Sequence, residues 1–446
     1  MKPSTNNTPP QGYKMTELGA LPEEWEVVPL DNKYIEFQNG LWKGKKEPYI
    51  KVRVLRNTNF NNDGTIDFED VAELDVEQRN FKNREIIKDD IILERSGGGP
   101  TQPVGRVVFF EREDQFMYSF SNFTSRIRIS DKLIIFPKFL FYFLLDFYNQ
   151  GKTNDIQNRT TGIRNLDFSR YKQIPIPLPP LPEQQKIAAV LSAVQEAKEK
   201  TEAVIKATKA LKKSMMKHLF TYGPVSTEEA ENVPLKETEI GPVPKDWHVV
   251  RLGEVAEKVK QKDPRRDPIH EFKYIDVSAI SNDLLKITSY SEFLGKDAPH
   301  RARKTIQTND IIFATVRPYL KRIAMVPENL NGQIASTAFC VIHCQKQIAN
   351  PYYIFYTVSL DNFIKGVSEN QRGSSYPAVT DKDILNQYIP LPPLPIQQKI
   401  ASILSAIDAK IEAEENKKQA LEELFKTLLD NLMTAKIRVN HLEVPS

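Results

Sequence analysis

The sequence predicts an α+β protein in which one mixed α/β domain occurs twice and each copy is followed by a long helix. Three observations predict this fold class. Two sequence blocks recur in the two halves of the 446-residue chain, a proline-rich segment closes each copy, and an apolar stripe with helical spacing follows each proline-rich segment. The two helices are expected to pair as an antiparallel coiled coil, which would give the chain a pseudo-two-fold arrangement.

The recurrence of these blocks is too close for chance. Residues 16–25 contain Thr-Glu-Leu-Gly and a tryptophan, and they return as residues 238–247 with an offset of 222. Residues 176–188 return as residues 389–401 with an offset of 213, sharing Ile-Pro-Leu-Pro-Pro-Leu-Pro and Gln-Gln-Lys-Ile-Ala. Copies of this length exceed solenoid repeats, so the sequence predicts duplicated domains. Trp25 and Trp247 are expected to be core anchors.

The two repeats and the two helices divide the chain into seven segments. Each globular domain reads as mixed α/β, with short strands such as residues 85–93 and 310–314 and one helix near residues 137–148. The predicted segments are a flexible N-terminal tail (1–15), the first globular domain (16–180), the first long helix (181–222), a linker (223–237), the second globular domain (238–393), the second long helix (394–438) and a C-terminal tail (439–446).

Each long helix is preceded by prolines that are expected to act as a stiff brace. Prolines at positions 175–182 favour extended polyproline II, and Pro182 suits the first turn of a helix. The alternative is a flexible linker or a ligand for an SH3-type domain. Residues 198–217 carry seven Lys and two Glu, whereas residues 408–426 carry four Lys and six acidic residues. These opposite charges favour pairing of the two helices.

The composition indicates the cellular compartment of the protein more clearly than its function. The net charge of +3 neither requires nor excludes nucleic acid, and two cysteines fit a reducing cytoplasm. The most apolar stretch, residues 133–148, corresponds to residues 351–366, which contain Thr357, Ser359 and Asp361. A buried helix is therefore expected in both copies, and no membrane segment.

Basic clusters and divergent loops mark the candidate DNA contacts. The loops after the matched Asp-Ile-Ile strands differ entirely, Arg-Ser-Gly-Gly-Gly-Pro against Thr-Val-Arg-Pro-Tyr-Leu-Lys-Arg, which fits two copies that read different sequences or neutral drift in loops. Lys and Arg neutralise phosphates, and Arg reads guanine edges. The candidates are Lys43, Lys45, Lys46, Arg95, Arg106, Thr160, Thr161, Arg164, Lys262, Arg265, Arg266, Arg303, Arg317, Tyr319, Lys321, Arg322, Ser374, Ser375 and Tyr376.

Motifs for catalysis or for cofactor and metal binding are not found. The triple Gly at 97–99 is not followed by the Gly-Lys-Ser/Thr of a phosphate loop. Asp90 and Glu94 could suggest a nuclease pair, but the second copy has Asp310 and Ala314, so Asp90 is expected to be a turn residue entering a strand. Cys340 and Cys344 would lie ~13 Å apart on one strand face, which predicts core packing and no zinc site. No catalytic, cofactor-binding or metal-binding residue is predicted.

Thr-Glu-Ile-Gly-x-x-Pro-x-x-Trp opening a domain and Ile-Pro-Leu-Pro-Pro-Leu-x-x-Gln-x-x-Ile-Ala opening a helix resemble the type I restriction–modification specificity subunits (HsdS). The resemblance covers about residues 16–437. It implies a cytoplasmic, non-catalytic DNA-binding subunit with two target-recognition domains, each reading one half of a bipartite asymmetric DNA site, and with helices that set the spacer.

The resemblance also implies partners and the cofactors that they bring. Two modification (methyltransferase) subunits would dock beside the helices and bring S-adenosylmethionine, and two restriction (translocase and nuclease) subunits could add ATP and Mg. No cofactor is expected in this chain itself. Two rival functions remain: a standalone DNA methyltransferase or nuclease, and a coiled-coil adaptor that binds only proteins.

Overall fold

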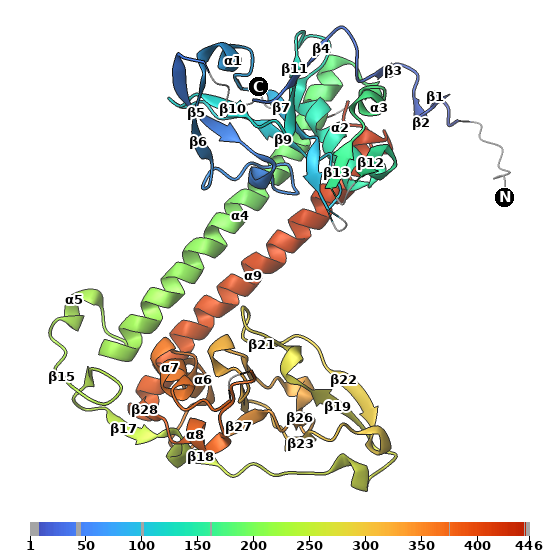
Figure 1. Ribbon diagram of the computed structural model, residues 1–446. Helices are drawn as coiled ribbons and strands as arrows, with labels where there is room; N and C mark the ends of the chain where they lie inside the picture. The colour runs from blue at the N-terminus through green and yellow to red at the C-terminus, as the bar shows by residue number, and fades with distance from the viewer. Residues whose placement is uncertain are drawn as a thin grey trace. The chain divides into compact units, whose positions relative to one another are not determined.

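The computed structural model describes residues 9–41, 46–99, 102–160, 163–373, 375–440 and 442. The chain forms two compact units: the first contains residues 1–201 and 417–446, and the second contains residues 202–416. The long helices are α4 (Leu181–Tyr222) and α9 (Leu394–Met433), drawn in green and in red in Figure 1. Each unit therefore contains one globular domain, part of α4 and part of α9.

A four-stranded antiparallel sheet forms the core of the first unit. Its strands lie in the order β4 (Ile35–Asn39), β11 (Thr124–Ile129), β7 (Asp90–Glu94) and β9 (Val107–Phe110). Every residue of β7 and β9 is buried, which explains the apolar sequence of β9 and the apolar centre of β7 between Asp90 and Glu94. Helix α2 (Pro137–Asn149) begins on a proline and packs against β7 and β9.

A second sheet and several short elements complete the first unit. The second sheet consists of β10 (Tyr118–Phe120), β5 (Tyr49–Leu55) and β6 (Ala72–Glu77), and β10 runs parallel to β5. The remaining elements are β1 (Tyr13–Thr16) with β2 (Gly19–Pro22), β3 (Glu26–Pro29) with β14 (Pro175–Leu178), β8 (Ser96–Gly98) with β13 (Ile163–Leu166) and β12 (Gln157–Thr160), α1 (Gln78–Lys82) and α3 (Phe168–Lys172).

The second unit repeats the strand order of the core sheet. Its second sheet has a fourth strand, and isolated bridges of Val316 and Arg372 to Ala378 stand where the first unit has the sheet of β12, β13 and β8. Its core sheet has the order β18 (Ala256–Glu257), β27 (Phe339–Cys344), β24 (Ile311–Ala314) and β25 (Ile323–Met325), antiparallel throughout. Its second sheet has the order β22 (Ser291–Leu294), β19 (Glu271–Ile275), β26 (Ile334–Ser336) and β23 (Ala302–Thr305), again with one parallel pair, β19 and β26. The predicted duplication of a mixed α/β domain is confirmed.

The other elements of the second unit differ from the first mainly in the covering helix. Where the first unit has α2, the second has two shorter helices, α6 and α7, that meet at Ser359 and Leu360. Among the described residues, every helix is too short or too polar to span a bilayer. The remaining elements are α5 (Thr227–Ala230), β15 (Leu235–Lys236), β16 (Val243–Pro244), β17 (His248–Arg251), β20 (Ile280–Ser281), β21 (Lys286–Ile287), α6 (Pro351–Val358), α7 (Asp361–Ser368), α8 (Asp381–Leu385) and β28 (Tyr388–Leu391).

The two long helices approach each other within each unit. In the second unit, Lys209 and Lys212 of α4 form ion pairs of 2.8 and 2.6 Å with Glu415 and Asp408 of α9. From Lys209 to Lys212 the residue number rises along α4, whereas that of the partner falls from Glu415 to Asp408 along α9, so the two helices run in opposite directions there. In the first unit, the start of α4 and the end of α9 share one buried apolar cluster. Coiled-coil packing along the full length stays a prediction.

The proline brace is a strand pair and not polyproline II. Residues Pro175–Leu178 form β14, which pairs antiparallel with β3, and β28 pairs with β17 in the same way. Prolines alternate with Ile176 and Leu178, so every missing N–H can face away from the single partner strand. This pairing cannot be seen in the sequence, because β3 lies near the start of the domain sequence and β14 at its end.

A buried glutamine clamps the start of each long helix. The Gln184 amide accepts a hydrogen bond from Phe136 N (2.8 Å) and donates to Ile134 O (2.9 Å) and Pro179 O (2.8 Å). Gln397 accepts from Asn350 N and donates to Ile348 O and Pro392 O at the same three distances. Both side chains are fully buried. These bonds fix the helix to the segment before α2 or α6.

Three further sequence expectations need correction at their boundaries. The strand expected at 85–93 begins only at Asp90, because Asp89 adopts a positive φ of 74° and the Asp90 carboxylate accepts a hydrogen bond from Ile87 N, 2.8 Å. The tail expected at 1–15 ends earlier, since Tyr13 already belongs to β1, while residues 1–8 lie outside the described part. The second long helix ends at Met433 and not at 438, and Ala435 follows with a positive φ of 54°.

Candidate nucleic-acid interface

In each unit, the two loops that differ most between the copies lie together. In the second unit these are loop 315–322 and segment 372–379. The Thr315 N–H donates to Ala338 O (2.8 Å), the Val379 N–H donates to Thr315 O (2.9 Å), and the Arg317 N–H donates to Pro377 O (2.8 Å). No sequence pattern joins these two loops, and their backbone hydrogen bonds place them on one surface.

Loop 315–322 is an unusually constrained turn. Arg317 and Lys321 both lie in the left-handed region, with φ of 49° and 52°, on either side of the 3-10 turn Pro318–Leu320. Left-handed backbone costs roughly 1–2 kcal/mol for a residue with a side chain. The conformation is held because Pro318 is buried and because the Ala314 N–H donates to Arg322 O at the base of the loop, 3.0 Å.

Side chains on this surface combine cations with exposed aromatic rings. The Arg317 guanidinium lies 5.3 Å from the ring centre of Tyr376, which is 74% exposed. Tyr319 is 50% exposed at the tip of the turn. Lys321 pairs with Asp361, and Arg322 donates to Val277 O (2.7 Å). Ser375 is exposed, and its carbonyl accepts a bond from Arg317, 3.4 Å.

The first unit brings its equivalent loops together as a small sheet. Strand β8 pairs with β13, where Gly98 faces Arg164, and the Ser96 hydroxyl bonds Asn165 Oδ1 at 2.5 Å. Gly97 has φ of 103°, a conformation that favours glycine, and its missing side chain leaves room for Asn57 at this position. The described part of this surface presents the glycine backbone of β8 and the exposed Ile163 of β13, where the second unit presents tyrosines.

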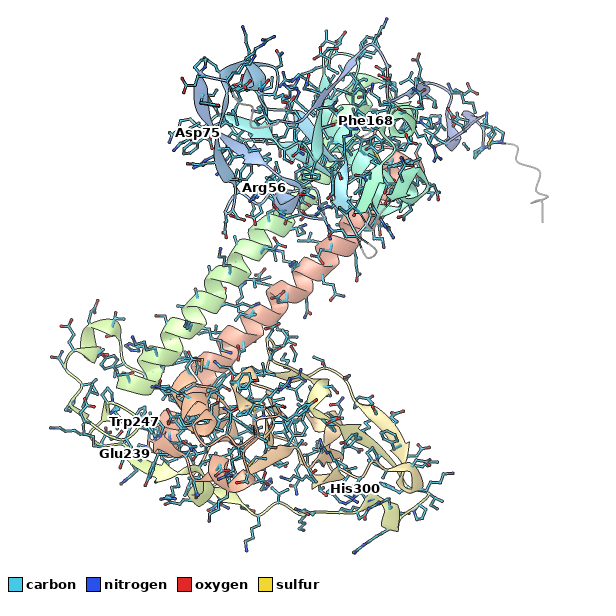
Figure 2. All side chains as sticks on the ribbon, in the orientation of Figure 1. Arg56, Asp75, Phe168, Glu239, Trp247 and His300 are labelled. Atoms are coloured by element: carbon cyan, nitrogen blue, oxygen red, sulfur yellow. The ribbon has the colours of Figure 1, made fainter. Side chains whose placement is uncertain are left out.

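Arg95 is the clearest recognition candidate of the first unit. Its guanidinium stacks on the Phe168 ring at 4.0 Å and donates to Asn39 Oδ1 at 2.5 Å; Phe168 is labelled in Figure 2. Burial lowers the pKa of Arg95, and its Nε has no hydrogen-bond partner among the described residues. Because Nε is buried and Nη1 bonds Asn39 and Ser125, the donors left for a phosphate or a guanine edge are those of Nη2, which has no hydrogen-bond partner in the described part of the chain.

Arg106 is removed from the DNA candidates. Its guanidinium forms a two-fold ion pair with Glu94, with Nε–Oε2 of 2.9 Å and Nη2–Oε1 of 2.8 Å, and it also donates to Phe60 O and Asn57 O. The residue is only 8% exposed. Nε, Nη1 and Nη2 each donate inside the domain, and the guanidinium neutralises buried Glu94. The same pair explains Glu94 without nuclease chemistry.

The basic cluster at 262–266 is partly neutralised. Asp263 pairs with Arg265 (3.0 Å) and Arg303 (3.4 Å), and the hydrogen bonds from Arg265 lower the pKa of Asp263 to about 2. Lys262 and Arg266 are exposed. In the first unit, Lys46 is exposed and its N–H donates to Glu77, 2.6 Å.

Some candidates cannot be placed. Lys43, Lys45, Thr161 and Ser374 lie outside the described residues, and only the backbone of Thr160, in β12, is described. The sequence analysis also missed the residues that orient the candidates, such as Asn39, Phe168 and Asp361. No sequence signal marks them, because each contact joins distant segments.

Metal and redox sites have little support in the described part of the chain. No group of three His, Cys, Asp or Glu lies there within reach of one metal ion. Cys340 and Cys344 are both buried in β27, and burial raises the pKa of Cys344 to about 12. Asp310 begins the same turn as Asp90, accepting from Gln307 N at 2.8 Å, and its other oxygen contacts His343 at 2.5 Å. The turn role predicted for Asp90 is confirmed in both copies.

Comparison with known proteins gives one consistent family. The family model of the type I restriction modification DNA specificity domain matches residues 22–208 and 244–423. The type I restriction enzyme MjaVIII specificity subunit of Methanocaldococcus jannaschii is 29% identical over 458 residues, which cover 95% of each chain. The HsdS subunit from Thermoanaerobacter tengcongensis is 45% identical over a match that covers 41% of this chain and 45% of that chain, with a TM-score of 0.34.

One solved structure matches nearly the whole chain. The type I restriction–modification S subunit from M. genitalium has a TM-score of 0.57 and 16% identity, and the match covers 92% of this chain and 96% of that chain. At this identity the likeness concerns the fold alone. It agrees with the duplicated α+β architecture described above.

Proposed function

Because the chain belongs to the type I restriction–modification DNA specificity family, we propose that it is the non-catalytic specificity subunit of such a system. Each globular domain reads one half of a bipartite, asymmetric double-stranded DNA target. The observation that carries this proposal is the contrast between framework and loops: the two units share strand order and glutamine clamps, whereas Arg95 with a glycine-rich strand in one unit is replaced by Arg317, Tyr319 and Tyr376 in the other.

The long helices have two roles in this proposal. They set the distance between the two half-sites, and they form the surface on which two modification subunits dock with S-adenosylmethionine. Restriction subunits with ATP and Mg are further partners, and the complex works in the cytoplasm. Charge supports the helix pairing, since Lys209 and Lys212 meet acidic residues of α9.

Mapping methylated adenines in the host genome tests the proposal. A split sequence whose methylation disappears when this gene is deleted supports it, and methylation that persists unchanged overturns it. In a second experiment, residues 16–180 are exchanged for another recognition domain. Only one half of the methylated sequence should change; a change in both halves contradicts modular reading.

The rival functions predict different biochemistry. A standalone methyltransferase would transfer labelled methyl groups from S-adenosylmethionine to DNA without partners. A protein-only adaptor would show no salt-dependent DNA binding in the complex with its modification subunits. Salt-dependent, sequence-specific binding by that complex, without methyl transfer by the isolated chain, supports the specificity role.

A further inference from the structure

Tyr319 stands out among the exposed aromatic residues of the second unit. It is the central residue of the turn Pro318–Leu320, half of its surface is exposed, and its ring has no hydrogen-bond or ring partner among the described residues. A large ring without a partner at a loop tip has no role in the core of this unit.

The backbone of the turn that carries this ring is held by several contacts. Backbone N–H groups of Leu320 and Lys321 donate to Arg317 O and Pro318 O, both at 2.9 Å, and the turn packs against α7. Two residues with side chains are kept in left-handed backbone, a costly conformation that persists only where surrounding bonds enforce it. The backbone that carries the ring is therefore fixed before binding, and only the rotation of the side chain has to be ordered on binding.

The surroundings of the ring favour an anionic partner. Arg317 precedes the turn and its guanidinium lies over the Tyr376 ring, while Arg322 lies on the other side of the turn and donates one hydrogen bond to Val277 O. Lys321 is held by Asp361. Two exposed rings beside two arginines match the phosphate backbone and bases of DNA better than an apolar protein surface.

In the first unit the matching loop is described as far as Gly99, and its described residues 97–99 are glycines without a ring. Two aromatic residues lie beside it: Phe168, which is covered by Arg95, and Phe123, which is exposed in a different turn and whose carbonyl accepts from Arg95 N, 2.8 Å. The difference lies on an otherwise common framework, so it concerns recognition and not folding.

We propose that Tyr319 is a wedge that inserts its ring against a base step of the half-site read by the second domain, with Arg317 and Tyr376 holding the flanking backbone. The inference rests on the proposed function. Inserted side chains partly unstack a step and kink the duplex, and the sequence preference then includes how easily that step deforms. The half-site of the first domain is read without such a wedge.

The test uses the complex of this chain with its modification subunits and a duplex carrying the mapped target. The fluorescent adenine analogue 2-aminopurine is placed in turn at adenines within and beside each half-site, but not at the methylated adenines, which a methyltransferase flips out of the stack. We expect its fluorescence to rise on binding at one step of the second half-site, because unstacking relieves quenching, and to stay low throughout the first.

Three variants separate stacking from other roles. Tyr319→Ala should abolish the fluorescence rise and weaken binding by about 10-fold to 100-fold, as for loss of one stacked ring. Tyr319→Phe keeps the ring and should keep both. Tyr388→Ala is the matched control, since Tyr388 is also exposed and lies 5.4 Å from an arginine, Arg251, but belongs to β28; it should bind like wild type.

The outcomes distinguish this inference from the proposed function. If the complex binds its target and Tyr319→Ala shows unchanged affinity and fluorescence, the wedge is overturned while the specificity role stands. A Tyr319→Phe variant as weak as Tyr319→Ala would also overturn it, since a hydroxyl contact would then be responsible. If wild type shows no target-specific binding, the proposed function itself fails. Thermal unfolding of each variant confirms that the second unit is folded.

Discussion

Replacing Gln397 by methionine removes the clamp of the second long helix while nearly keeping side-chain volume. The amide makes three hydrogen bonds in a fully buried place. Loss of a hydrogen bond costs about 1 kcal/mol on average, and a buried polar group left without a partner costs about 1–3 kcal/mol. One N–H and two carbonyls lose their partner here, so we expect about 3–6 kcal/mol of destabilisation, a large part of the ~5–15 kcal/mol that holds a domain folded.

The neighbouring glutamine provides the control. Gln398 is exposed and follows Gln397 directly in the chain. Gln398→Met therefore changes the same residue type on the same helix turn without leaving a buried polar group unbonded. Gln184→Met and Gln185→Met repeat the comparison in the first unit, where Gln185 is exposed. Hydrogen exchange of the segments around residues 348–358 and 389–404 locates the effect, and urea unfolding gives its size.

The result that would refute the reasoning is a Gln397→Met variant within about 0.5 kcal/mol of Gln398→Met, the usual range for surface substitutions. The helix would then be held by the strand pair β17–β28 and by apolar packing alone. A destabilised variant that still binds DNA should do so more weakly but with the same sequence preference, because the clamp fixes the attachment of the domain and not the loops.

Three other predictions follow from buried and exposed charges. Burial raises the pKa of Asp146 to about 6, so the stability that this group contributes is present below its unfolded pKa near 3.8 and is lost as the pH rises through about 6. Asp146→Asn should therefore raise the free energy of unfolding by at most about 3 kcal/mol at pH 7.5 and should not raise it at pH 4. Urea unfolding at both pH values measures the difference. Arg106→Met should destabilise the first unit by about 3–5 kcal/mol, because Glu94 is left buried without its ion-pair partner. Adding Glu94→Leu should recover most of that loss. If DNA affinity falls while the stability stays unchanged, Arg106 contacts DNA after all. Lys262→Ala and Arg266→Ala should each lower the salt dependence of DNA binding by about one unit of slope with no change in the sequence bound, whereas an unchanged slope would place both side chains away from the phosphates.

Features carried by short-range pattern were predictable from the sequence. The repeats identified the duplication, heptad spacing identified α4 and α9, and both tryptophans lie in the core, with Trp25 donating to Glu183 at 2.9 Å. The glutamine clamp was within reach as well. The repeated block contains two glutamines in each copy, and the helical stripe that begins at Ile187 and Ile400 places Gln184 and Gln397 next to its apolar side, whereas Gln185 and Gln398 are exposed.

Features that depend on pairing between distant segments were not predictable. Prolines 175 and 177 suggested a free-standing brace because their partner strand, β3, begins at Glu26. Arg106 resembled a recognition residue because it follows a glycine loop, and only the register of β7 against β9 shows that it reaches back to Glu94. Arg95 and Tyr319 could be nominated from sequence, but the ring and the turn that orient them could not.

The two copies allow framework and recognition residues to be separated on physical grounds within one chain. Identical residues bond the same groups in both units: the clamp glutamines and the aspartates that begin the β7 and β24 turns bond backbone groups, and the hydroxyls of Tyr142 and Tyr356 meet Ser192 and Ser405 on the long helices. Each bonds a group that would otherwise be unsatisfied, so a substitution costs folding energy whatever sequence is read. Tyr319, which differs between the units, is exposed and bonds no framework group through its ring among the described residues, so its side chain can change without that cost. Independent reading of two half-sites needs recognition surfaces that can differ between the copies and a framework that stays the same in both.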